Sequence, residues 1–105
     1  MIQVTVLYPA GDGRTFDMDY YLQTHIPLFR KRMGAAMKKI SVVQGISGAT
    51  VASPAPFVAI VHGTFESVEA FETAFAPHAV EIQGDIPKYT DIQPVIQISQ
   101  VQVQE

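Results

Sequence analysis

Apolar and polar residues alternate along four separate segments of the chain, which predicts four β-strands. From Ile2 to Tyr8 every second residue is a large apolar one, and a period of two is typical of a strand with one buried face. Residues 40–48 and 96–98 alternate in a similar way. Residues 57–65 are apolar on both faces, so we expect this third strand to be covered on both sides.

A helical period separates the first strand from the second. Asp17 is a suitable N-cap, and one continuous helix is predicted to run from it to about residue 37. At 100° per residue, a stripe of apolar side chains forms the expected buried face: Met18, Leu22, Ile26, Phe29, Met33, Ala36 and Met37. Tyr21 and His25 lie on the flank of this stripe, and Tyr20 points away from it, towards the surface or an interface.

Pro27 interrupts this predicted helix. A proline inside a helix lacks the amide donor, and its ring crowds the carbonyl of the residue four positions earlier, here Gln23. We therefore expect a kink that frees one or two backbone carbonyls near Gln23. The kink can serve packing alone, or it can bend the helix around a cavity.

A second helix is predicted between the third and fourth strands. Ser67 is its expected N-cap, and Val68, Phe71 and Phe75 share one face. After a further short turn, Gly84 is expected to close this segment. In the last strand the apolar positions change parity after Ile98, which predicts a bulge or a segment that leaves its own sheet to pair with a second subunit.

The order β-α-β-β-α-β predicts a ferredoxin-like α+β fold with a four-stranded antiparallel sheet. A chain of 105 residues corresponds to one domain, residues 1–105. Helices on one face of such a sheet leave the other face bare. The doubly apolar third strand and the low charged content of 16% indicate that this face is covered by a second copy, so a homodimer is expected.

Composition excludes several classes of function. The chain has no cysteine and a net charge of −3, so it offers no thiolate nucleophile, no disulfide and no broad basic face for nucleic acid. The basic residues 30–32, 38 and 39 are expected to complement the dipole of the first helix at its C-terminal end. No membrane-length apolar run or signal peptide is evident, and a cytoplasmic location away from membranes is expected.

His25 is the first candidate for chemistry. An imidazole at this position can act as a general acid or base, because its ordinary pKa is near neutrality. The alternative is a half-buried histidine bound to a carbonyl that Pro27 frees. Tyr21 can donate a hydrogen bond to a substrate oxygen, or it can be a packing residue with a solvated hydroxyl. Phe29, one turn after His25, is expected to contribute apolar surface to the same pocket.

Tyr89 and His62 are further candidates for binding a substrate. Tyr89 lies in an irregular stretch between prolines, where it can close a pocket or anchor the chain, and His62 can line a cavity or serve only in packing. The three histidines come from separate elements without metal-ligand spacing, so no metal is expected. No cofactor is expected either; a haem with one axial histidine is the alternative.

Two motifs resemble those of the EthD family. Residues 16–28 lead from an acidic helix start through Tyr20-Tyr21 to a His-x-Pro-Leu sequence, and residues 85–91 with Pro94 resemble the closing motif of the family. The resemblance covers nearly the whole chain. It implies a dimeric α/β-barrel in which two ferredoxin-like subunits join their sheets. The family takes its name from a protein linked to the degradation of ethyl tert-butyl ether, a xenobiotic.

Three hypotheses for function follow. The first is a cofactor-independent enzyme of small-molecule catabolism, an oxygenase, isomerase or lyase, that holds an apolar or aromatic compound between helices and sheet and uses His25 and Tyr21. The second is a non-catalytic binding or carrier protein for a partner oxygenase. The third is a scaffolding dimer whose interior is filled by its own side chains.

Overall fold

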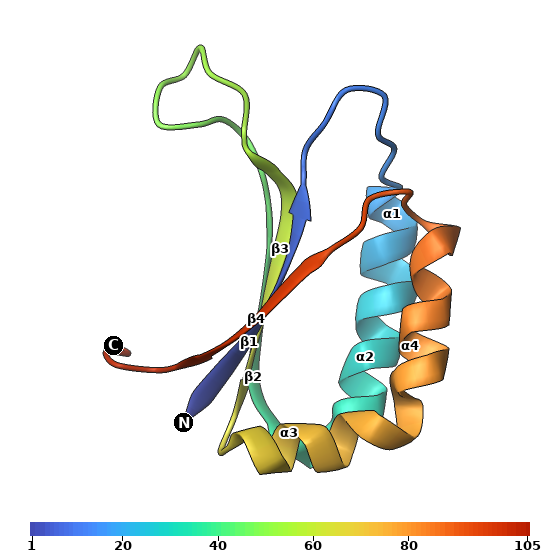
Figure 1. The fold of residues 1–105 in the computed structure, drawn as a ribbon, viewed down its shortest axis with the longest axis vertical. Helices are drawn as coiled ribbons and strands as arrows, with labels where there is room; N and C mark the ends of the chain where they lie inside the picture. The colour runs from blue at the N-terminus through green and yellow to red at the C-terminus, as the bar shows by residue number, and fades with distance from the viewer.

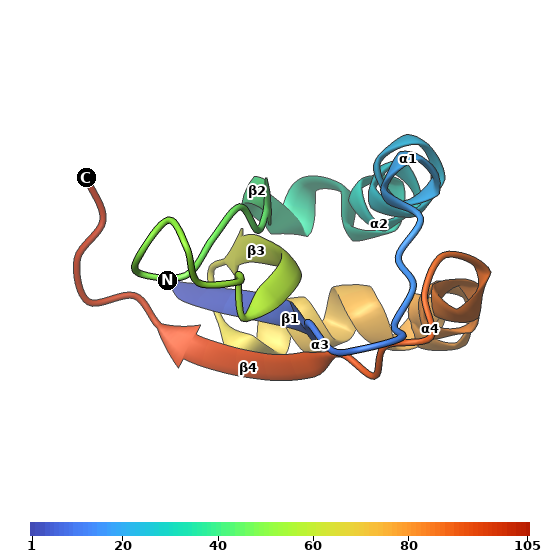
Figure 2. The same cartoon turned by 90° about the horizontal axis from the view of Figure 1, so that it is seen from above.

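The computed structural model describes all residues, 1–105, and its elements follow the order that the sequence predicted (Figure 1). Four strands form one antiparallel sheet in the order β2-β3-β1-β4. Their bounds are Ile2–Pro9 for β1, Met37–Gln44 for β2, Phe57–Phe65 for β3 and Val95–Gln100 for β4. The helices all lie on one side of the sheet (Figures 1 and 2). The ferredoxin-like α+β fold is therefore confirmed.

Each helical connection is divided into several segments. Between β1 and β2 these are α1 (Met18–Tyr20), a π-helical turn (Tyr21–His25), α2 (Ile26–Met33) and a 3-10 turn (Gly34–Ala36). Between β3 and β4 they are α3 (Val68–Phe75), a 3-10 turn (Ala76–His78), α4 (Ala79–Asp85) and a 3-10 turn (Ile86–Lys88). None of these helices has the length and apolar character needed to cross a bilayer.

The π-turn changes which side chains of the first helix are buried. The N–H of Ile26 donates to the carbonyl of Tyr21, five residues earlier, so Tyr21 takes the place below Ile26 that a regular α-helix would give to Leu22. Tyr21 is fully buried, whereas Leu22 is 47% exposed. The predicted stripe was therefore wrong at Leu22. Pro27 is the second residue of α2, where its missing amide donor is tolerated.

The first helix also ends earlier than predicted. Gly34 adopts a positive φ of 56° and caps α2, a conformation that favours glycine. Met37, which the pattern placed in the helix, is the first residue of β2. The strand correspondingly ends at Gln44, and Ile46 is exposed outside it, so the predicted range of 40–48 was shifted by several residues.

The caps and β3 agree with the sequence prediction, whereas the end of the second connection does not. The carboxylate of Asp17 accepts from the N–H of Tyr20 at 3.1 Å, and the hydroxyl of Ser67 caps α3. β3 has the predicted bounds of 57–65. Gly84 does not close the second segment, because α4 continues to Asp85. Phe71 packs against the core but Val68 is exposed, so the predicted shared face held only in part.

The register of the sheet fixes which residues face the helices. Val6 pairs with Val61, and both belong to the core between sheet and helices. The adjacent pair, Thr5 with His62, must point to the opposite face, because successive side chains of a strand alternate. No element of the chain covers that opposite face (Figure 2).

The predicted change in the parity of the apolar positions after Ile98 lies close to the end of β4. The ladder with β1 stops at Gln100, and the N–H of Val101 donates to the carbonyl of Met1 at 3.1 Å. Residues 102–105 lie outside the sheet, and Val103 is exposed. The chain thus leaves its own sheet where the pattern predicted a change of environment.

Candidate functional site

A cavity of about 170 Å³ lies between the sheet and the helices. β1 contributes Val4, Val6 and Tyr8 to its wall, and the first helix contributes Tyr21, His25, Ile26 and Phe29. The rest of the lining is also apolar except for Gln83. A cavity of about 150 Å³ is large enough for benzene, so this one accommodates a single-ring compound or an aliphatic compound of similar size.

An outer hollow of about 500 Å³ adjoins this cavity and shares four lining residues with it: Gln83, Ile86, Pro94 and Ile96. Gln83 and Ile96 are exposed to solvent. The shared residues belong to α4, the turn after it, and the start of β4. The cavity therefore opens towards solvent between α4 and β4.

His25 forms a buried pair with Asp85. Its Nδ1 lies 3.0 Å from Oδ2 of Asp85, and both residues are less than 10% exposed. Nδ1 therefore carries the hydrogen and donates a hydrogen bond to the carboxylate. Nε2 has no hydrogen-bond partner in the protein, so its lone pair is available to a ligand, provided that the imidazole is neutral.

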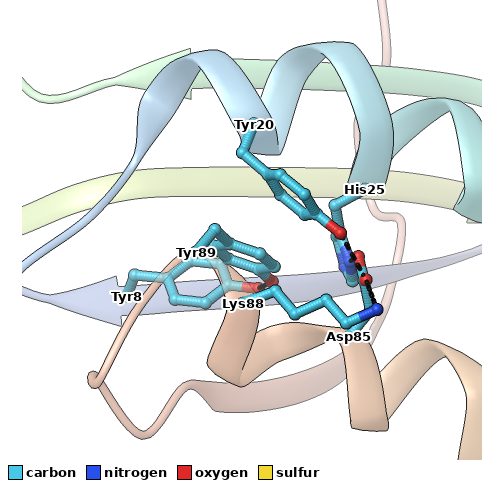
Figure 3. A network of polar contacts seen from close by, with 6 residues as sticks. All are labelled: Tyr8, Tyr20, His25, Asp85, Lys88 and Tyr89. Atoms are coloured by element: carbon cyan, nitrogen blue, oxygen red, sulfur yellow. Dashed lines mark hydrogen bonds and ion pairs between the residues drawn. The ribbon is translucent and has the colours of Figure 1, made fainter.

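The carboxylate of Asp85 also contacts two further side chains (Figure 3). The hydroxyl of Tyr20 donates to Oδ1 at 2.7 Å, and Nζ of the exposed Lys88 lies 3.9 Å from the same oxygen. The placement of Tyr20 corrects the expectation that it points away to the surface, because the π-turn rotates this part of the helix towards α4. The carboxylate thus lies between the buried imidazole and the protein surface.

The environment of the pair favours a neutral imidazole beside an ionised carboxylate. Burial lowers the pKa of His25, and the nearby Asp85 opposes this effect without cancelling it. Burial would raise the pKa of Asp85, but hydrogen bonds from Tyr20 and His25 outweigh it, and the net pKa lies below its ordinary value. At neutral pH the pair is therefore arranged as a histidine base oriented by a carboxylate.

Tyr21 carries a buried hydroxyl without a partner. Its oxygen forms no hydrogen bond, although the residue is fully buried. Its ring stacks on that of His25 with centroids 5.7 Å apart and planes 15° apart. Burial raises the pKa of Tyr21, so the hydroxyl stays protonated. An unsatisfied buried donor is rare in proteins, and here it belongs to a residue that lines the cavity.

Tyr89 does not line the cavity, but its ring packs against that of His25, which does. Its hydroxyl lies 2.6 Å from that of Tyr8, and its ring lies 4.7 Å from the His25 ring. Burial raises the pKa of Tyr89. Its backbone carbonyl also accepts from the N–H of Asp17 at 2.7 Å, so this residue joins the turn after α4 to the start of the first helix.

The remaining binding candidates lie in different places. Phe29 lines the cavity together with His25 and Tyr21. His62 lies on the opposite face of the sheet, where its Nδ1 is 2.9 Å from Nε2 of Gln3 and 3.1 Å from the hydroxyl of Thr5. The structure therefore brings Tyr21, His25 and Phe29 together and separates His62 from them.

The sequence interpretation missed Asp85, Tyr20 and Tyr8 as parts of this site. One signal for Asp85 was present: it is the last residue of α4, where a carboxylate is unfavourable because the helix dipole is negative at this end. Its position only becomes unusual once α4 is known to continue past Gly84. For Tyr20, the π-turn is needed to orient the side chain.

No metal-binding cluster of three or more histidine, cysteine, aspartate or glutamate residues is present in the structure. A haem is also a poor fit for the site. The cavity has room for about one benzene-sized ring, which is too little for a porphyrin. The site is defined by a histidine, a carboxylate and a tyrosine.

Fold and site together define a small ferredoxin-like α+β protein with a buried histidine–carboxylate pair beside an apolar cavity. The model of the EthD domain matches residues 13–93. The chain is 41% identical to an EthD-like protein of Ralstonia eutropha JMP134, with a TM-score of 0.94 over 99% of this chain and 94% of that one. The chain therefore belongs to the EthD family.

Two more distant structures share the fold. An EthD family protein of Bacillus halodurans C-125 is 17% identical, with a TM-score of 0.76 over 96% of this chain and 98% of that one. The hydroxynitrile lyase of Passiflora edulis is also 17% identical, with a TM-score of 0.68 over 99% of this chain and 96% of that one. No curated protein matches this chain.

Proposed function

We propose that the protein is an enzyme of small-molecule catabolism that removes a proton from a small apolar or aromatic substrate without a cofactor. The observation that carries this proposal is the buried pair of His25 and Asp85 at a cavity that is also lined by Tyr21, whose buried hydroxyl has no hydrogen-bond partner. Such a set contains a base, a group that orients it and a donor for developing negative charge.

In the proposed step, Nε2 of His25 takes a proton from an O–H group, or from a C–H group next to a carbonyl. The bond to hydrogen breaks, its electron pair stays on the substrate, and the resulting imidazolium is stabilised by Asp85 at 3.0 Å. The hydroxyl of Tyr21 donates to the substrate oxygen on which negative charge develops. Because the unbound hydroxyl has no partner, this hydrogen bond does not require another to be broken first.

The cavity favours a compact substrate with one polar group. Its volume of about 170 Å³ is close to what a single ring requires. The lining is apolar, and the polar groups are confined to His25, Gln83 and the tyrosine hydroxyls. Small phenols, lactones and tertiary alcohols meet these conditions as substrates, and a small quinone fits the cavity as a ligand that has no such proton. The hydroxynitrile lyase of Passiflora edulis has the same fold, which by analogy supports an enzyme on this scaffold, whereas the chemistry is argued from the site itself.

We also propose that the protein acts as a homodimer joined through the bare face of the sheet. Ile60 of β3 and its partner Val43 of β2 lie on this face, and Val43 is 46% exposed. Gln3, Thr5 and His62 share this face, and Lys39 of β2 lies at its edge opposite Thr64. A second copy of the same face would bury these apolar side chains.

The test is a thermal-shift screen with these four compound classes on the wild type, His25→Ala and Tyr21→Phe, followed by turnover assays of each hit. A ligand at about 100 times its Kd raises the free energy of unfolding by about 2.7 kcal/mol. His78→Ala is the matched control, since it removes a histidine outside the cavity.

The proposal requires that a hit is converted to product and that turnover is lost in His25→Ala but kept in His78→Ala. Turnover should fall on the acid side of a pH profile as His25 becomes protonated. Binding that survives His25→Ala with no conversion of any hit would contradict the enzyme and favour the carrier. No hit with the well-folded wild type would contradict both.

A further inference from the structure

A second hollow, of about 550 Å³, lies between α2 and the start of β2. Four basic residues line it: Arg30 and Lys31 from α2, and Lys38 and Lys39 from the start of β2. No acidic residue does so, and no residue of this hollow lines the cavity of the proposed active site. It is therefore a separate feature of the molecule, with its own charge.

The basic residues of the chain divide into two groups. The sequence contains seven lysines and arginines. Arg14, Arg32 and Lys88 each lie within 4.0 Å of a carboxylate, that of Asp91, Glu81 and Asp85 respectively. The other four are those of the hollow, and none of them forms an ion pair. In a chain with a net charge of −3, every unpaired basic side chain is thus gathered at one place.

A β-bulge helps to gather them. Met37 pairs with Phe65 and Lys39 with the next residue of β3, Thr64, so Lys38 is an extra residue in β2. Met37, Lys38, Lys39 and Ile40 line the hollow in succession, so the hollow follows the edge of β2, and the bulge adds one lysine to this edge. Bulges are common at sheet edges and beside functional sites.

The helix dipole accounts for only part of this arrangement. Arg30 and Lys31 lie in the last turn of α2, where positive charge is favourable, and Nζ of Lys38 donates to the carbonyl of Ala35 at 3.2 Å. The sequence placed all of these cations on one helix, but Lys38 and Lys39 belong to β2. No hydrogen bond or ion pair of the side chain accounts for the position of Lys39.

We propose that this hollow, named here the basic hollow, binds a small molecule that carries two or more linked phosphoryl groups. Four unpaired cations require several negative charges for neutralisation, and a phosphoryl group carries about −1.5 to −2 at neutral pH. Arginine binds phosphate oxygens in a bidentate manner and lysine binds them as a point charge. A volume of about 550 Å³ is within the usual range for small-molecule sites.

The test uses isothermal titration calorimetry of the protein with inorganic pyrophosphate in a buffer of low ionic strength. Lys31→Gln/Lys39→Gln removes one charge from each side of the basic hollow. Arg14→Gln is the control, since it removes a cation that is paired with Asp91 outside the hollow. The expected results are saturable binding, a loss of affinity of about tenfold or more in the double variant, and less than about twofold in the control.

In a two-dimensional NMR spectrum, the changes in backbone amide chemical shift that pyrophosphate causes should be confined to residues 27–40. Orthophosphate should bind about tenfold more weakly than pyrophosphate. Absence of saturable binding would overturn the proposal. Equal losses in the double variant and in Arg14→Gln would do the same, because they indicate an effect of net charge alone. Binding to vesicles of anionic phospholipid but not to pyrophosphate would assign the surface to a membrane instead.

Discussion

Nδ1 of His25 lies 3.0 Å from Oδ2 of Asp85, although 60 residues separate them in the sequence. The contact joins the π-turn of the first helix to the last residue of α4, so it depends on how the two helical connections pack. It fixes the proton on Nδ1 and leaves Nε2 as the free base. The proposed chemistry depends on this one tautomer, which makes the pair the first subject for experiment.

Asp85→Asn should lower the pKa of His25 further, because the carboxylate opposes the effect of burial on this imidazole. The substitution retains the shape of the side chain and removes its charge. The pKa is read from the pH dependence of the His25 ring resonances in NMR spectra. Loss of the charge should also reduce the population that is protonated on Nδ1, which the nitrogen chemical shifts report.

Backbone amide resonances of the turn between α3 and α4, which forms no hydrogen bond with the pair, show whether the substitution disturbs the fold. A pKa of His25 that stayed constant or rose in Asp85→Asn would show that the carboxylate does not stabilise the imidazolium.

Acid should destabilise the protein in two separate ranges of pH. The folded-state pKa of His25 lies below its ordinary value of 6.5, so below about pH 6.5 the unfolded chain binds a proton that the folded chain does not. The free energy of unfolding therefore falls as pH decreases from there through the folded-state pKa, by at most about 1.4 kcal/mol per pH unit. The pKa of Asp85 is also lowered, from 3.8, so its contribution is lost only at more acidic pH.

Urea unfolding of the wild type, His25→Gln and His78→Gln between about pH 5 and pH 7 measures this dependence. The slope should flatten in His25→Gln and persist in His78→Gln. A wild-type slope that His25→Gln leaves unchanged would assign the pH dependence to other groups.

Local periodicity predicted most of the fold, because each strand and helix has to bury one face. The bounds of β3 and the caps at Asp17 and Ser67 were predicted correctly. The errors arose where one residue changes the register of the backbone. The π-turn before Pro27 exchanges Tyr21 for Leu22 on the buried face, and the positive φ of Gly34 ends the helix three residues before Met37.

Less of the candidate site could be predicted. His25, Tyr21 and Phe29 are close in sequence on one helix, so their common location was accessible from the pattern. Asp85 comes from another helix, and no local pattern links it to His25. That pairing is a property of tertiary packing, and the same holds for the hydroxyl of Tyr8 that meets Tyr89 across 81 residues.

Leu22→Ala should destabilise the protein by less than about 1 kcal/mol, because its side chain is 47% exposed. Ile26→Ala, one π-turn above Tyr21 and almost fully buried, should reduce the free energy of unfolding by about 2 kcal/mol or more. Urea unfolding measures both. Similar losses in the two variants would indicate a regular α-helix with Leu22 on its buried face.

Ile60→Lys should weaken the proposed homodimer, because it introduces a charge into the uncovered face of the sheet. Light scattering coupled to size-exclusion chromatography should show a dimer for the wild type and a monomer, or a concentration-dependent mixture, for the variant. Val51→Lys is the matched control, since this valine lies in the loop between β2 and β3 and is 96% exposed. A wild-type monomer at high protein concentration would rule out the dimer.

Two removals of a tyrosine hydroxyl should have opposite consequences for stability. Tyr89→Phe leaves the buried hydroxyl of Tyr8 without its partner at 2.6 Å, so the free energy of unfolding should fall by about 1–3 kcal/mol. Tyr21→Phe removes a buried donor that has no partner, so the free energy of unfolding should stay constant or rise by up to about 1 kcal/mol. Urea unfolding compares the two variants directly. A large loss in Tyr21→Phe would mean that its hydroxyl is satisfied inside the unbound protein and is not held free for a ligand.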